Sequence, residues 1–410
     1  APDGIHVLTL ATKKTRLLVP NPPRPETPED SKDPMARFRG RIHAIVVGRK
    51  TPTVFFSKSE AGNKPGAYVS TVYAANIETG AVKKLVTLPA GASIVTINAD
   101  ETLGAGTMND GPAVAPPYGA NLPPGAARRS TPDPLAGAHV QPEGKGAMME
   151  RRLASRQPLI LFTINLQTGK MTTLLHSTDW VNHLLFSPVD PTLLMYCHEG
   201  PWQKVDRIWM IHTDGTHNTL IHKRTMLMEI AGHEFWGLDG KTIWYDWQYP
   251  KGEDFFLASY NLDTHQRTAY HMQRNEWSIH FNLTQDLDLF TGDGGDPGQV
   301  AKAPDGEWIE LFRPQLITGQ GAINEPDFWQ PGVFHSEHLV NMSHHNYRLE
   351  PNVRFTPDKS MVLFTSNMFG PSYVFGVEVQ KAVNPPAADI QSTPELGAKF
   401  NPTKPVPTPN

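Results

Sequence analysis

A short turn phrase recurs along this chain, with its last three copies ending 46 and 49 residues apart and its first two 89 residues apart, which is one repeat plus an insertion. The phrase is Asn-Ile-Glu-Thr-Gly or a close variant of it, and it stands at 76–80, 165–169, 211–215 and 261–264. Each phrase lies between short runs of β-forming residues, and no stretch keeps the 3.6-residue period of an amphipathic helix. A period in the forties with four strands per repeat is typical of a β-propeller.

Divided into 410 residues, this period gives six to eight repeats, and we predict seven. The predicted fold is all-β: a seven-bladed β-propeller with four-stranded antiparallel blades around a central channel. We assign residues 1–382 to this single domain. Residues 108–157 are rich in Pro, Gly and Ala, which indicates a long insertion in one blade with a short helix near 148–153. The Pro-rich residues 383–410 are predicted to form an extended tail.

Composition argues against two classes of partner. Charged residues make up 19% of the chain and the net charge is −4, so no basic surface for nucleic acid is expected. No apolar run approaches the roughly 18 residues that a membrane helix needs. The single cysteine, Cys197, rules out an intramolecular disulfide, and its apolar neighbours predict a buried structural role.

The start of the chain bears weakly on location. The first residue is Ala1 rather than Met, which favours a periplasmic or secreted protein without its signal peptide over a cytoplasmic one. We expect a monomer or a homodimer.

Histidines, carboxylates and an arginine concentrate between residues 196 and 236. These residues are His198, Glu199, Asp206, Arg207, His233 and Glu234. Such a mixture suits a site that holds an anionic substrate and moves a proton. His280 follows His233 by one repeat length, and both lie at the start of a repeat. In a closed ring the two side chains are predicted to meet near the axis.

Three motifs in this region resemble a known family. Cys-His-Glu-Gly-Pro at 197–201, Val-Asp-Arg at 205–207 and His-Glu-Phe-Trp at 233–236 are similar to motifs of the oligogalacturonate lyases, a family of seven-bladed propellers. The likeness runs from about residue 160 to residue 380. Propeller repeats alone do not produce these motifs, so the resemblance favours a lyase over a generic propeller.

The resemblance implies roles for individual residues. His233 matches the family's general base, and Arg207 matches an arginine that assists at the substrate. His198 is a third catalytic candidate, either by contact or by orienting its neighbours. The candidates for substrate binding are His183, Tyr347, Arg348 and Trp236. An alternative role for Tyr347 is general acid, because a phenol can protonate a leaving group.

A metal site is also implied, with one departure from the family. His280 matches a histidine that binds manganese. The other family ligands form a Gln-x-x-His-x-His run, whereas this chain has Tyr347, Glu350 and Asn352 there. One imidazole with oxygen ligands suits Mn²⁺ first and Ca²⁺ second. The predicted ligands are His280, Glu350, Asn352 and His345, and loss of the metal is the alternative.

These features predict a lyase for uronate oligosaccharides. His233 would abstract the proton at C5 and Arg207 would bind the substrate carboxylate, in a metal-assisted β-elimination that leaves a 4,5-unsaturated uronate. The alternative is a non-catalytic propeller that serves as a binding or scaffold module. Convergence of the histidines, Arg207 and Glu350 at one end of the channel favours the enzyme, and a scattered arrangement favours the binding module.

Overall fold

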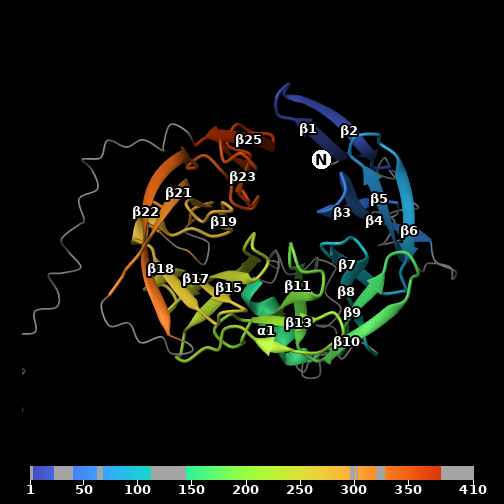
Figure 1. Ribbon diagram of the computed structural model, residues 1–410, viewed down its shortest axis with the longest axis horizontal. Coiled ribbons are helices and arrows are strands. Elements are labelled where there is room, and N and C mark those ends of the chain that lie inside the picture. Colours follow the sequence, from blue (N-terminus) through green and yellow to red (C-terminus); the bar gives the residue numbers. More distant parts are fainter. Residues whose placement is uncertain are drawn as a thin grey trace, which may run out of the picture.

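The computed structural model describes residues 3–22, 40–61, 68–111, 145–295, 301, 303–319 and 328–379. Strands dominate these ranges, and the sheets follow one another in a ring (Figure 1). The prediction of an all-β fold is confirmed. Within the described ranges, no helix is long and apolar enough to cross a membrane.

Consecutive antiparallel strands form units, and five units have four described strands each. The first unit consists of β3 (Ile42–Val47), β4 (Thr53–Ala61), β5 (Tyr68–Asn76) and β6 (Val82–Thr87). The second consists of β7 (Ala92–Ile97), β8 (Leu103–Asn109), β9 (Leu159–Asn165) and β10 (Met171–Ser177). The third consists of β11 (Trp180–Phe186), β12 (Leu193–Glu199), β13 (Ile208–His212) and β14 (Thr219–Leu220). The next two are β15 (Ile230–Trp236), β16 (Thr242–Gln248), β17 (Phe255–Asn261) and β18 (Arg267–His271); and β19 (Asn282–Leu283), β20 (Phe290–Gly292), β21 (Trp308–Leu316) and β22 (Trp329–Asn341).

Two further groups of strands stand at the ends of the chain. They are β1 (Gly4–Thr9) with β2 (Lys14–Pro20), and β23 (Arg354–Phe355) with β24 (Met361–Ser366) and β25 (Tyr373–Glu378). One link between units departs from simple repetition. Strand β18 pairs in parallel with β22 and joins two units into an eight-stranded sheet.

The turn phrase found in the sequence has one structural basis. The side-chain Oδ1 of Asn76 accepts hydrogen bonds from the backbone N–H groups of Glu78 and Thr79, at 3.0 and 2.8 Å. Asn165 and Asn261 make the same pair of bonds in their own turns. An asparagine that bonds its own backbone two or three residues on fixes a tight reversal between strands. The repeat in the sequence is therefore a repeat of strand connections.

The insertion predicted in one blade lies between β8 and β9. The predicted short helix is confirmed as α1 (Lys145–Ser155), which directly precedes β9. Residues 112–144 of the insertion and the predicted tail 383–410 lie outside the described residues.

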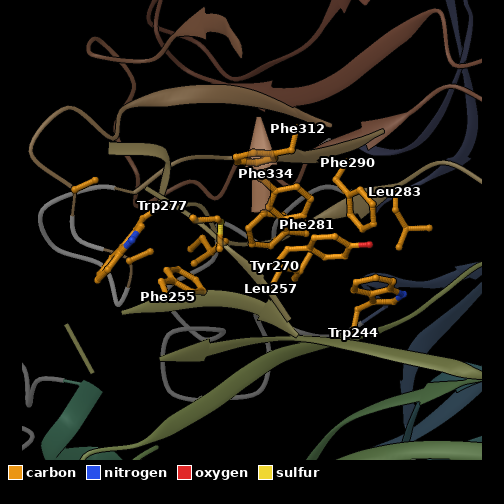
Figure 2. Packing of buried hydrophobic residues seen from close by; sticks show 14 residues of the cluster. Trp244, Phe255, Leu257, Tyr270, Trp277, Phe281, Leu283, Phe290, Phe312 and Phe334 are labelled. Atoms are coloured by element: carbon orange, nitrogen blue, oxygen red, sulfur yellow. The ribbon is translucent and has the colours of Figure 1, made fainter. Parts of the chain in front are cut away.

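Aromatic residues fill the space between units. In the cluster shown in Figure 2, Tyr270 of one unit stacks on Phe334 of the next with ring centroids 4.8 Å apart. Trp244 meets Phe290 edge to face at 5.1 Å. Phe290 and Phe312 are fully buried. Offset and edge-to-face contacts of this kind add to the stabilisation from buried apolar area.

One carboxyl group is buried beside this apolar cluster. Glu310 precedes Phe312 by two residues on β21, so the two side chains share a face of the sheet. It is 1% exposed, and neither of its oxygens has a hydrogen-bond partner; His338 Nδ1 is 3.7 Å away. Burial, with the charges of Glu276 and Asp305, raises the pKa of Glu310 to about 8.

This carboxyl predicts a pH dependence of stability. The folded state holds the proton of Glu310 up to about pH 8, whereas the unfolded chain releases it near its ordinary pKa of 4.5. Stability should therefore fall as pH rises between these values. The loss should be about 2–5 kcal/mol in the free energy of unfolding. Glu310→Gln should remove that part of the slope in urea unfolding at about pH 5 and pH 8; a variant with the wild-type slope would contradict the assignment.

Candidate active site

Four consecutive units place a left-handed backbone residue at one equivalent position. His183, His233 and His280 each have φ 48°, and Asn352 has φ 53°. Each lies three residues before the end of the first strand of its unit, in β11, in β15, before β19 and before β23. Positive φ is uncommon outside glycine, and Asn and His adopt it more readily than most residues. In β11 and β15 the residue is also part of a β-bulge, which redirects a side chain out of the regular alternation.

His233 and His280 meet, as their spacing predicted. Their ring centroids are 4.8 Å apart, with the rings edge to face. His233 Nδ1 is 2.6 Å from Asp246 Oδ2, and His280 Nδ1 is 2.8 Å from Asp293 Oδ2. Both carboxylates are at most 2% exposed. A carboxylate on Nδ1 fixes the ring orientation and leaves Nε2 as the atom that faces a substrate or a metal.

The surroundings separate the charge states of these two histidines. Burial lowers the pKa of His233, and the neighbouring charge of His280 lowers it further. Burial also disfavours charge on His280, but the hydrogen bond to Asp293 and the charges of Asp293 and Glu350 outweigh it and raise the pKa. Burial raises the pKa of Asp246, whose Oδ2 faces His233 Nδ1. In the tautomer that carries its proton on Nδ1, the neutral ring of His233 has Nε2 unprotonated.

Asp246 and Asp293 were not assigned roles from the sequence. Each follows its histidine by 13 residues, the distance from the first strand of a unit to the second. That equal spacing is the signal that could have identified both.

A second cluster adjoins the pair through β12 and β15. His183 Nε2 is 3.0 Å from Glu199 Oε2, and Arg207 Nη1 donates to Glu199 Oε1 at 2.6 Å. His183 Nδ1 is 3.9 Å from Glu234 Oε1. Burial alone would raise the pKa of Glu199, but the hydrogen bond from His183 and the charge of Arg207 lower it to about 2.

Arg207 is placed differently from its predicted role. Its side chain is 1% exposed and is held by Glu199, so its guanidinium does not lie open to a substrate carboxylate. Its Cζ lies 4.4 Å from the centroid of the Trp202 ring, and that ring and the ring of His233 meet edge to face with centroids 4.9 Å apart. Gly232 permits this contact, because a Cβ at that position would come within 2.6 Å of the indole. Arg207 is therefore linked to His233 through Trp202 in this structure.

The predicted metal-binding segment lies beside His280. Glu350 Oε2 is 3.9 Å from His280 Nε2, and the Glu350 side chain is 58% exposed. Asn352 donates its backbone N–H to Asp293 Oδ2 at 3.2 Å and its side-chain Nδ2 to the Glu350 carbonyl at 3.2 Å. The buried Tyr347 donates its hydroxyl to the Asp293 carbonyl at 3.5 Å. His280, Glu350 and Asn352 are therefore brought together.

Two other predicted residues serve the fold in this structure. Both ring nitrogens of His345 are bonded within its own unit, to Ser366 Oγ at 2.9 Å and to the Leu349 carbonyl at 2.7 Å, so neither is open to a metal. Trp236 lies in a core cluster and donates its indole N–H to the Leu185 carbonyl at 2.9 Å. These contacts explain why the two residue types were misleading candidates: each is used for packing and internal hydrogen bonding.

The remaining two candidates are His198 and Arg348. His198 alternates with Glu199 on β12 and so faces the opposite side of the sheet. Its ring packs on Trp209 at 4.8 Å, and burial lowers its pKa. Arg348 is exposed.

Helix α1 borders the site at the start of β11. Arg156 pairs with Asp179, and Lys204 Nζ is 2.8 Å from Glu150 Oε1. Arg152 lies 4.0 Å over the ring of Trp180, whose strand position pairs with Glu199. The end of the insertion is thereby fixed next to the cluster of His183.

Together, an imidazole held by a buried carboxylate and a neighbouring imidazole that faces a second carboxylate form a site that can exchange protons on an all-β ring. The sequence comparisons specify the class further. A family model described as oligogalacturonate lyase matches residues 152–383. The chain belongs to the oligogalacturonate lyase family, and the matched region contains every candidate residue described above.

Two curated relatives match a similar part of the chain. The oligogalacturonide lyase of Pectobacterium atrosepticum is 28% identical over 230 residues, covering 54% of this chain and 56% of the relative. The oligogalacturonate lyase of Dickeya dadantii is 29% identical over 238 residues, with the same coverage. The match therefore spans about half the length of these relatives.

Two solved structures of oligogalacturonate lyases have a fold similar to that of this chain. An oligogalacturonate lyase in complex with manganese is similar with a TM-score of 0.62 at 19% identity, covering 91% of this chain and 82% of that one. An oligogalacturonate lyase from Vibrio parahaemolyticus gives a TM-score of 0.55 at 16% identity, covering 93% and 97%.

Proposed function

We propose that this chain is a polysaccharide lyase that cleaves oligogalacturonate by β-elimination, with His233 as the general base. The observation that carries the proposal is the contact of His233, fixed by Asp246, with His280, which faces Glu350. This convergence favours an enzyme over the binding module considered from the sequence. Family membership supports a substrate from pectin.

The chemistry needs three contributions at the substrate. The proton at C5 of a uronate is weakly acidic because the adjacent carboxylate is already negative. A base must remove it, a positive charge must stabilise the enolate-like transition state, and the oxygen at C4 must leave. His233 Nε2, unprotonated at neutral pH, provides the base.

We further propose a divalent metal at His280 and Glu350, with Asn352 beside them. The residues fit such an ion: Asp293 holds His280 Nδ1, so Nε2 is directed at an exposed carboxylate 3.9 Å away. One nitrogen with oxygen donors suits Mn²⁺ first, as in the similar solved structure, and Ca²⁺ second. When bound, the ion would supply positive charge to the uronate carboxylate.

Metal binding can be measured without any substrate. Glu350→Ala is expected to weaken the affinity for Mn²⁺ by about 10-fold or more in isothermal titration calorimetry, because it removes a ligand carboxylate. Glu78→Ala, which removes an exposed carboxylate in a distant turn, is the matched control and should bind Mn²⁺ as the wild type does. Equal affinity in the wild type and Glu350→Ala would overturn this ligand assignment.

We also propose that the ring is a seven-bladed propeller. The support for seven blades comes from the groups of strands along the described part of the chain. These groups are five four-stranded units, the pair β1–β2 and the group β23–β25. The two smaller groups lie at the ends of the chain, next to residues outside the described ranges.

The function is tested by ultraviolet absorbance, because elimination creates a double bond conjugated to the carboxylate. The chain is incubated with oligogalacturonate and with oligomers derived from rhamnogalacturonan and glucuronan, with added Mn²⁺ or chelator. We expect the absorbance to rise on oligogalacturonate and the rise to shrink with chelator. A flat trace on every substrate would contradict the proposal.

A further inference from the structure

The three histidines at the equivalent position are not held in the same way. His233 and His280 use Nδ1 to contact a carboxylate, whereas His183 uses Nε2 to contact Glu199 at 3.0 Å. The strand register explains the difference. The residue before His233 pairs with Asp246, but the residue before His183 pairs with Cys197.

The carboxylate that reaches His183 therefore comes from two residues further along β12. Because Nε2 is engaged by Glu199, Nδ1 is the free side of the ring. It lies 3.9 Å from Glu234 Oε1, beyond hydrogen-bond distance. The His183 side chain is 46% exposed, against 17% for His233 and 18% for His280.

The charges around His183 balance only when its ring is protonated. The Glu234 side chain is fully buried, and neither of its oxygens has a hydrogen-bond partner. Glu199 is nearly buried as well, and Arg207 is the other cation among these groups. With a neutral His183, two buried carboxylates would share one guanidinium, which is costly in a low-dielectric site.

The direction of the His183 titration agrees with this charge count. The hydrogen bond to Glu199 raises the pKa of His183 against the opposing effect of burial. The charge of Glu234 adds to the rise, and that of Arg207 opposes it. His183 is thus favoured as a cation, and its exposed ring occupies the position in its own unit that His233 occupies in the next.

We propose that His183 is the general acid of the elimination and donates its Nδ1 proton to the leaving oxygen; the inference rests on the proposed lyase function. His233 Nε2 takes the proton from C5, the electron pair forms the C4–C5 double bond, and the C4–O bond breaks. The leaving oxygen takes the proton from His183, and the exposed ring regains a proton from water. Tyr347, the acid considered from the sequence, is 9% exposed and its hydroxyl faces the Asp293 carbonyl.

The test compares two leaving groups in one variant. His183→Asn is suitable because Asn352 holds the equivalent backbone conformation in its own unit. One substrate is oligogalacturonate, whose leaving alkoxide needs a proton. The other is a galacturonate that carries a 2,4-dinitrophenoxy group at C4, and this group leaves as a stable phenolate without needing a proton. His183→Asn should lower kcat/KM about 100-fold or more on oligogalacturonate and less than about 10-fold on the dinitrophenyl ether.

Two controls make the comparison specific. His233→Asn should slow both substrates alike, because proton abstraction at C5 is common to both. His217→Ala, at an exposed histidine of a turn with φ 54°, should change neither rate. The ratio of the two substrates within one sample is independent of the fraction that is folded.

The outcomes distinguish failure of the general-acid role of His183 from failure of the proposed lyase function. If the wild type is active but His183→Asn slows both substrates equally, His183 only binds the substrate or supports the fold, and the inference fails alone. If the wild type releases no unsaturated product from either substrate, the inference and the lyase function fail together.

Discussion

Replacing His233 by asparagine is expected to lower kcat/KM on oligogalacturonate by about 10²–10⁴-fold, the range for loss of a general base. Asparagine tolerates the left-handed backbone at this position, as Asn352 does, so the variant should remain folded. The measurement is the rate of absorbance increase in saturating Mn²⁺, with circular dichroism to confirm folding. A folded variant within a few-fold of the wild type would exclude His233 as the base.

Asp246→Asn is the informative companion. It leaves the imidazole in place but takes away the carboxylate that keeps the proton on Nδ1. We expect kcat to fall with little change in KM, because the wrong tautomer still allows substrate to bind. An effect confined to KM would mean that Asp246 acts on binding rather than on the base.

Removing the charge of Arg207 should be the most destabilising single change described. Arg207→Met keeps much of the side-chain volume but leaves Glu199 and Glu234 buried without a guanidinium. Loss of one partner from a buried ion pair costs about 3–5 kcal/mol in the free energy of unfolding. Urea unfolding monitored by tryptophan fluorescence would measure it. Arg348→Met, at an exposed arginine, should stay within about 0.5 kcal/mol of the wild type.

A double variant shows whether the pair is the cause. Adding Glu199→Gln to Arg207→Met should cost less than the sum of the two single changes, because the unpaired charge disappears. A fully stable Arg207→Met with a raised KM would instead return Arg207 to the role suggested by the resemblance, a contact with the substrate carboxylate.

The sequence predicted the parts of the site that repeat. Asn76 and Asn165 mark equivalent turns, so the strands between them could be placed in order. Once that period was known, His233 and His280 were expected to meet, and their contact at 4.8 Å confirms it. The family motifs then indicated the region that contains His233 and the segment that contains Glu350 and Asn352.

The sequence did not predict which carboxylates contact those histidines. The carboxylate that reaches each ring depends on strand register and on a bulge, which are set by pairing across the sheet. In the unit of His183 the contacting carboxylate stands two residues further along the second strand than in the unit of His233. Glu199 therefore contacts Nε2 of His183, whereas Asp246 contacts Nδ1 of His233. The burial of Arg207 likewise follows from the packing of Trp202 over it.

The central claim is that the chain eliminates rather than hydrolyses, and the mass of the product tests it most directly. Oligogalacturonate is incubated with the chain in Mn²⁺, and the fragments are measured by mass spectrometry and proton NMR. Elimination predicts a fragment with a 4,5-unsaturated uronate at its non-reducing end and a total product mass equal to that of the substrate. Fragments whose total mass exceeds the substrate by one water would show hydrolysis and contradict the account.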